Sequence, residues 1–190
     1  MLIEAERSRL VLVDLQARLF PAMTESPPGL LLRLKLLVRA ARLLAIPVVA
    51  TRQYPQGLGP LLPELAEVLP DDVYRADKMS FSCCADADIA PVFEDHRDQV
   101  LIAGIETHVC VLQTAFDLVS CGKTPYVLAD GCASRDPTHH AQALERLGRE
   151  GVRIASIEST VFEWLRGADH VRFRELAREI RDLPKAIAGV

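Results

Sequence analysis

Three residues with different chemistry stand at comparable places in the sequence, each near the end of a short apolar or β-rich run. Asp14 directly follows residues 10–13, Lys78 follows a run at about residues 73–75, and Cys110 comes after residues 100–103. An acid, a cation and a thiol at neighbouring strand ends could supply a nucleophile, its base and an orienting group. The sequence therefore predicts a catalytic unit of Asp14, Lys78 and Cys110.

Each residue also has an ordinary interpretation when it is taken alone. Asp14 could be a surface turn residue, Lys78 an exposed lysine and Cys110 a packing residue of an apolar helix. Thr107 is a candidate N-cap three residues before Cys110, and a helix N-terminus favours a thiolate, lowering its pKa from about 8.5 toward neutrality. His108 is an alternative base, ranked second because residues two apart on a helix do not face each other.

Short β-rich runs alternate with longer amphipathic segments along the chain. Strands are expected at about residues 9–13, 48–51, 73–75, 99–103, 125–129 and 153–156, and helices at about residues 29–45, 61–67, 108–121 and 138–150, with a helical pair over residues 161–190. This alternation predicts a three-layer αβα Rossmann-like α/β fold with a six-stranded, mostly parallel sheet in one domain, residues 1–190. Ligands of such sheets bind beyond the carboxyl ends of the strands, where the three residues lie.

The composition narrows the classes of partner. The chain has 190 residues, 49% hydrophobic and 25% charged, and its formal net charge of -4 gives no electrostatic reason to expect nucleic acid or an anionic membrane. The N-terminus is acidic where a signal peptide would be basic, and basic residues interrupt the most apolar stretch. The five cysteines show no CxxC spacing, which argues against a disulfide framework or zinc site. We therefore expect a cytoplasmic protein.

Several segments resemble the signature blocks of the isochorismatase-like cysteine hydrolases. These are "VLVDLQARLF" (residues 11–20), "DKMSFS" (77–82) and "GIETHVCVLQTAFDL" (104–118), followed by "ADGCASRD" (129–136) and "IESTVFEWL" (157–165). The segment "TRQYPQGLGPLLPEL" (51–65) resembles the subgroup of isochorismatase domain-containing protein 2 and related hydrolases. The likeness covers most of the chain in order.

The resemblance implies a Cys-Asp-Lys triad at Cys110, Asp14 and Lys78. It also implies a non-proline cis peptide between Ile105 and Glu106, and an oxyanion hole formed by the backbone N–H groups of Glu106 and Cys110. In the implied mechanism Asp14 takes the proton of Cys110, the thiolate attacks a carbonyl carbon, and water later cleaves the thioester. Lys78 would hold Asp14 in place and stabilise its anion, or help to stabilise the thiolate.

The sequence departs from the metal-dependent nicotinamidases of this superfamily. They carry a metal-binding Asp-x-His after the second strand, where this chain has Gln53 and Tyr54. We therefore expect no metal and no cofactor, and a small-molecule substrate. Its orientation would come from Gln16, Phe20, Gln53, Tyr54, Phe81 and Glu106. The Glu106 carboxylate would either pair with a neighbouring group or select a basic or hydrogen-bond-donating substrate.

Three interpretations of function stay open on the sequence. The first is an amidase-type cysteine hydrolase. The second is a catalytically quiet family member that acts through oligomeric assembly or partner binding, although such members usually lose a triad residue and this chain keeps all three. The third is isochorismatase-type vinyl ether hydrolysis. The family commonly forms homo-oligomers, and we expect one here.

Overall fold

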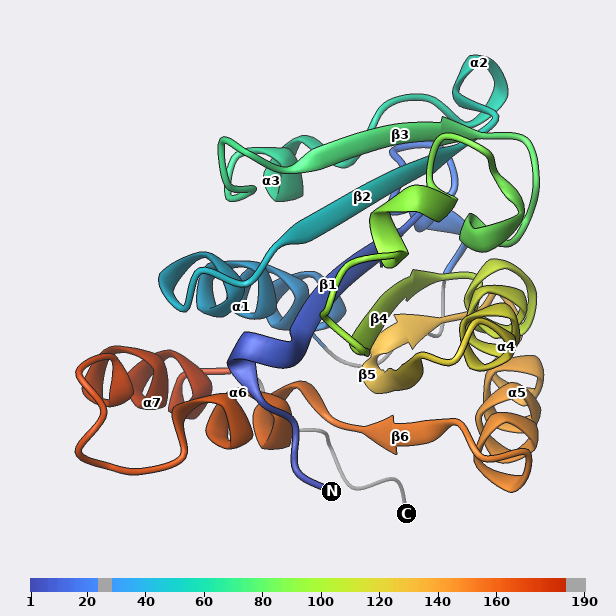
Figure 1. Ribbon diagram of the computed structural model, residues 1–190. Coiled ribbons are helices and arrows are strands. Elements are labelled where there is room, and N and C mark those ends of the chain that lie inside the picture. The colour runs from blue at the N-terminus through green and yellow to red at the C-terminus, as the bar shows by residue number, and fades with distance from the viewer. Residues whose placement is uncertain (24–28, 184–190) are drawn as a thin grey trace.

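The strands form one sheet whose order places the first strand at the centre. In the computed structural model, which describes residues 1–23 and 29–183, the strands are β1 (Ser8–Val13), β2 (Val48–Gln53), β3 (Tyr74–Lys78), β4 (Gln99–Ile105), β5 (Thr124–Ala133) and β6 (Arg153–Ala155). The order is β3-β2-β1-β4-β5-β6, and all five neighbouring pairs are parallel (Figure 1). The predicted fold class is confirmed, with a sheet that is entirely rather than mostly parallel.

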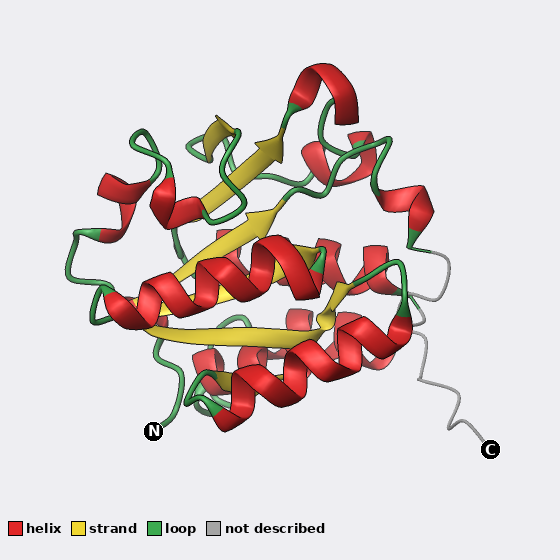
Figure 2. Ribbon diagram, turned by 90° about the vertical axis from the view of Figure 1, so that its right-hand side faces the viewer, coloured by secondary structure: helices red, strands yellow, loops and turns green. Residues whose placement is uncertain are grey.

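Helices cover both faces of this sheet, as Figure 2 shows. The α-helices are α1 (Leu30–Leu43), α2 (Pro55–Leu58), α3 (Pro63–Ala66), α4 (Leu112–Ser120), α5 (Pro137–Arg149), α6 (Ile157–Leu165) and α7 (Phe173–Arg181). Short turns of other helix types are η1 (Ala5–Arg7), η2 (Phe20–Ala22), η3 (Cys83–Ala85), η4 (Ala90–Phe93) and η5 (Thr107–Val111), of which η5 is π-helical. None of the described helices is both long and apolar enough to span a bilayer.

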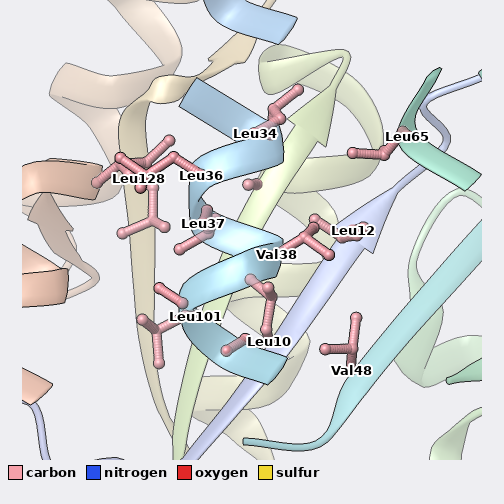
Figure 3. Packing of buried hydrophobic residues seen from close by; sticks show 14 of the residues in the cluster. Leu10, Leu12, Leu34, Leu36, Leu37, Val38, Val48, Leu65, Leu101 and Leu128 are labelled. Atoms are coloured by element: carbon pink, nitrogen blue, oxygen red, sulfur yellow. The ribbon is translucent and has the colours of Figure 1, made fainter. Parts of the chain in front are cut away.

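Alternate residues of the central strands enter two different cores, which explains why these strands are apolar without a break. Leu10 and Leu12 pack with α1, α6 and α7 in one buried cluster. Figure 3 shows the leucines of α1 against that face. Val11 and Val13 enter a second cluster on the other face, with residues of α4 and α5. Helices on both faces thus bury β1 completely.

Four strands, β2 to β5, run past their predicted carboxyl ends, and the last residues of β2 and β3 belong to the candidate site. β2 continues to Gln53 and β3 continues to Lys78, so Lys78 ends its strand rather than following it. Most of the residues added to β2 and β3 are polar (Arg52, Gln53, Asp77 and Lys78), which is why hydrophobic patterning places these strand ends too early. β5 likewise continues to Ala133, through an irregular register opposite Ile102 and Gly104.

The helices differ from expectation mainly around the sheet's carboxyl edge. The predicted helix over residues 61–67 is the short α3, and the unpredicted α2 precedes it. The predicted helix over residues 108–121 begins as the π-helical turn η5 and continues as α4. The predicted C-terminal pair corresponds to α6 and α7, and its end, residues 184–190, lies outside the described residues.

Candidate active site

The three predicted catalytic residues meet at the carboxyl edge of the sheet, where the strand order reverses between β1 and β4. Asp14 immediately follows β1, Lys78 ends β3, and Cys110 lies in η5 after β4. Lys78 Nζ lies 2.7 Å from Asp14 Oδ2, and both side chains lie close enough to the Cys110 thiol to influence its pKa. Residues separated by 64 and 96 positions from Asp14 therefore form one contiguous cluster, at the place where ligands of open parallel sheets bind.

Asp14 is held at a sharp turn that directs its carboxylate into the protein. Its φ of 54° lies in the left-handed region, which a non-glycine residue seldom adopts and which often marks a functional position. The turn is closed by the Gln16 amide, which donates to the Asp14 carbonyl oxygen at 2.8 Å. The side chain is fully buried, and Thr51 Oγ1 donates to Oδ1 at 2.8 Å. Each carboxylate oxygen therefore has a donor.

Lys78 is a buried ammonium group surrounded by acceptors. Besides Asp14, its Nζ donates to Gln53 Oε1 at 2.7 Å and lies 3.1 Å and 3.3 Å from the carbonyl oxygens of Phe81 and Ser80. Burial alone would lower the pKa of Lys78, but the negative charge of Asp14 and the nearby Cys110 outweigh burial and raise it. Lys78 therefore stays charged at neutral pH despite a side chain with no exposed surface.

The amide side chains of Gln16 and Gln53 hold the two loops of this edge together. Gln16 Nε2 donates to the carbonyl oxygens of Gln53 and Gly59, and its Oε1 accepts from the Gln53 backbone amide at 2.8 Å. Gln53 Nε2 donates to the Met79 carbonyl oxygen at 2.9 Å while its Oε1 accepts from Lys78. Both side chains are buried and bonded within the protein. Both residues were expected to orient the substrate, whereas in the structure they bind the loops and Lys78.

Cys110 is nearly inaccessible, with 6% of its surface exposed. Burial, followed by the negative charge of Asp14, raises the pKa of the Cys110 thiol well above its ordinary value, and Lys78 offsets this only in part. The expected helix-end thiolate is therefore wrong for the resting protein, in which the thiol is protonated. Thr107 is not a side-chain N-cap either, because its hydroxyl lies 2.9 Å from His140 Nδ1. Asp14 is the carboxylate with the largest influence on the pKa of this thiol.

A close approach of β4 to β1 brings η5 next to Asp14. Gly104 pairs with Val13 in the sheet, and a Cβ atom at Gly104 would overlap the Val13 backbone. The φ of Gly104 is 142°, a value that also favours glycine. The peptide bond between Ile105 and Glu106, shortly after Gly104, is cis. Glycine is therefore needed where the strand carrying Asp14 meets the strand leading to Cys110.

Glu106 follows the first of the two alternatives considered for it, pairing with a neighbour. Its carboxylate accepts from the backbone amide of Arg135 at 2.8 Å and from Arg135 Nε at 3.1 Å. The Glu106 side chain is 8% exposed, whereas that of Arg135 is 64% exposed. The pair joins the beginning of η5 to the loop after β5. The negative charge of Glu106 is thus already matched within the chain, which leaves little reason for it to select a basic substrate.

His108 faces away from the triad. Its Nδ1 lies 2.9 Å from Ser134 Oγ, and its ring centre is 4.9 Å from that of His139. Burial is the largest influence on the pKa of His108 and lowers it, which favours the neutral imidazole. These contacts agree with the lower rank given to His108 as the base.

The predicted aromatic substrate contacts divide into exposed and half-buried residues. Tyr54 and Phe81 are 49% and 52% exposed, and they lie on the loops that follow β2 and β3. Met79, which the sequence analysis did not consider, is 68% exposed on the same loop as Phe81. Phe20 is half-buried against the core on the α1 face. The exposed apolar side chains therefore stand on backbone that contacts the triad through Gln53 and Lys78.

Two further residues, Thr51 and Arg135, bind site residues and were not predicted from the sequence. Only Thr51 has a sequence pattern that could have indicated its role. Thr51 precedes Gln53 by two positions on β2, so both side chains project from the same face of that strand. A polar pair at this spacing could have been associated with a site. Arg135 is 29 residues from Glu106, and its pairing depends on the fold. Among residues 1–23 and 29–183, no group of three or more His, Cys, Asp or Glu side chains could hold a metal ion.

Comparison with known proteins gives consistent similarities over nearly the whole chain. Residues 8–159 match the isochorismatase domain. The mouse isochorismatase domain-containing protein 2A is 35% identical over 183 residues, which cover 93% of this chain and 84% of that protein. The secreted isochorismatase effector Isc1 of Phytophthora sojae is 36% identical over 191 residues, covering 96% and 88%. The structure of the MAR1 ribonuclease from Caenorhabditis elegans is similar with a TM-score of 0.89 at 30% identity, covering 100% of this chain and 98% of that one.

Proposed function

This chain belongs to the isochorismatase-like hydrolase family, and from that membership we propose that it is a cysteine hydrolase that cleaves an amide-type C–N bond of a small molecule. The observation that carries the proposal is the convergence of Asp14, Lys78 and Cys110 from three strand ends into one buried cluster. A thiol beside a carboxylate that could take its proton, with a third group that orients the carboxylate, fits the general pattern of covalent catalysis.

In the proposed acylation step, Asp14 accepts the thiol proton as Cys110 Sγ forms a bond to the carbonyl carbon. The protonated thiol of the resting protein suits this order of events, because the proton moves only when an electrophile is in place. Asp14 then gives the proton to the leaving nitrogen as the C–N bond breaks. The amine departs and the acyl group remains on Cys110 as a thioester.

In the deacylation step, water adds to the thioester carbon and gives a proton to Asp14. Collapse of the tetrahedral intermediate releases the carboxylic acid, and the sulfur of Cys110 regains the proton. Backbone N–H groups of Glu106 and Cys110 would stabilise the oxyanion in both steps, as the family resemblance implies. Lys78 keeps a positive charge beside Asp14 throughout the cycle.

The proposed substrate is small and carries an apolar group. Tyr54, Met79 and Phe81 offer exposed apolar surface on the loops that hold the triad, and the Glu106 carboxylate is already paired with Arg135. The Caenorhabditis elegans relative is described as a ribonuclease. We do not propose RNA for this chain, because its net charge of -4 offers no general attraction to a phosphate backbone.

The test is hydrolysis of a panel of small primary and secondary amides. The rate is measured as the release of ammonia or amine. Wild type and Cys121→Ser, which alters an exposed cysteine, should be active. Cys110→Ala should have no activity while keeping the wild-type thermal unfolding temperature within a few degrees. Undiminished amide hydrolysis by Cys110→Ala would end the proposal. Isochorismate belongs in the panel, and its cleavage by Cys110→Ala would favour the vinyl ether reaction.

A further inference from the structure

Strand β2 presents two polar side chains on one face, and each is bonded to a different member of the Asp14–Lys78 pair. Thr51 Oγ1 donates to Asp14 Oδ1, and two positions later Gln53 Oε1 accepts from Lys78 Nζ. Both side chains are at least nine-tenths buried. β2 therefore helps to position Asp14 through Thr51 and Lys78 through Gln53.

The geometry around Lys78 shows why Gln53 matters more than the other neutral acceptors. An ammonium group has three N–H donors. Its two shortest contacts, both 2.7 Å, are to Asp14 and Gln53, whereas the carbonyl oxygens of Phe81 and Ser80 are 3.1 Å and 3.3 Å away. Gln53 is itself fixed, since its Nε2 donates to the Met79 carbonyl oxygen. The side-chain oxygen of Gln53 is thus held toward Lys78.

The chemistry of this acceptor is also significant, because an amide oxygen accepts a hydrogen bond without bringing a charge. The ionisable groups that influence Lys78 are Asp14, Cys110 and Cys83, and those that influence Cys110 are Asp14, Lys78 and Cys83. Lys78 is the only cation in this group. A carboxylate at position 53 would place a second anion against Lys78 and offset the positive charge that reaches Cys110.

We propose that Gln53 is a positioning residue, which holds the Lys78 ammonium group beside Asp14 through a neutral acceptor and so preserves its positive charge for the Cys110 thiolate. The inference rests on the proposed function in taking Cys110 as the nucleophile. It replaces the substrate-binding role expected for Gln53 from the sequence. Gln53 acts on the thiol only through Lys78.

Alkylation of Cys110 by iodoacetamide tests the proposal without a known substrate. The rate at Cys110 is followed by peptide mass spectrometry at about pH 9 in wild type, Gln53→Glu and Gln53→Met. Gln113→Glu is the matched control, because it makes the same change at an exposed position of α4. Gln53→Glu should slow alkylation about tenfold, which corresponds to a rise of about one unit in the thiol pKa. Gln53→Met should slow it about threefold, and Gln113→Glu should react like wild type.

The direction of the change separates positioning from a purely structural role. A loosened site would expose the buried thiol and speed its alkylation, so an equal or faster rate in folded Gln53→Glu overturns the inference. If Gln53→Glu does not fold, Gln53→Met decides, and an unchanged or faster rate there is equally contradictory. If amide hydrolysis fails while Gln53→Glu slows alkylation, the proposed function is lost and the role of Gln53 remains. If wild type hydrolyses amides through Cys110 but Gln53→Glu is alkylated as fast as wild type, the proposed function stands and the positioning role of Gln53 is lost.

Discussion

Replacing Lys78 with methionine should destabilise the protein strongly at neutral pH. Both side chains of the Asp14–Lys78 pair have no exposed surface, and the charged atoms lie 2.7 Å apart. Removing one partner leaves the other charge buried without its counter-ion, which costs about 3–5 kcal/mol. A domain of this kind is stable by roughly 5–15 kcal/mol, so Lys78→Met should fold with a much lower midpoint of unfolding. The double variant with Asp14→Asn should lose less than the sum of the single losses, because no buried charge remains.

The pH dependence of this effect has a definite sign. The pKa of Lys78 is raised in the folded protein, so the pair stabilises fully below the unfolded-state pKa of about 10.4 and loses its effect as pH rises through the higher folded value. The gap between wild type and Lys78→Met should therefore be wide at neutral pH and shrink above about pH 10.4.

Urea denaturation at several pH values measures these differences. Lys35→Met is the matched control, since Lys35 is half-buried on α1 outside the site. This control should change the free energy of unfolding by less than about 0.5 kcal/mol. A loss below about 1 kcal/mol for Lys78→Met at neutral pH, or a stability difference that does not vary with pH, would contradict a buried, charged Asp14–Lys78 pair.

Three further predictions concern the surroundings of the triad. At about pH 8, iodoacetamide should modify the exposed Cys121 before Cys110, whose thiol has a raised pKa, and peptide mapping that shows Cys110 first would contradict this. Arg135→Ala should cost about 1–2 kcal/mol in urea denaturation, because it removes the side-chain donor to the buried Glu106 carboxylate, and a loss within error of zero would argue against that contact. Gly104→Ala should lower the stability by more than about 3 kcal/mol or prevent folding, since the added methyl overlaps the Val13 backbone, and a wild-type thermal unfolding temperature would disprove the close approach.

Much of the fold follows from patterns that are local in the sequence. The continuous apolar runs around Leu10 and Leu101 reflect strands buried on both faces, and their alternation with helices implies parallel neighbours. Asp136 and Pro137 predict the start of α5, where the Asp136 side chain accepts from the Thr138 backbone amide. Strand ends were less predictable. Gln53 and Lys78 are polar and bind site residues rather than the apolar core, so hydrophobic patterning does not mark them as strand residues.

The details of the site depended on contacts that no local pattern contains. The sequence placed Asp14, Lys78 and Cys110 at strand ends, but it could not show that the amide of Gln53 would bind Lys78. It suggested an activated thiolate for Cys110 because helix position is visible in the sequence, whereas burial beside Asp14 is not. The choice between pairing and substrate binding for Glu106 likewise needed the position of Arg135.

The most direct test of the proposed mechanism is the identity of the atom that carries the acyl group during turnover. Wild type is mixed rapidly with a small activated ester, quenched in acid, digested and mapped by mass spectrometry, with Cys110→Ser and Asp14→Asn treated in parallel. We expect an acyl adduct on Cys110 of wild type, no adduct at position 110 of Cys110→Ser within the same time, and a strongly slowed adduct in Asp14→Asn. Turnover with no adduct on Cys110, or an adduct formed equally fast in Asp14→Asn, would contradict the proposed mechanism.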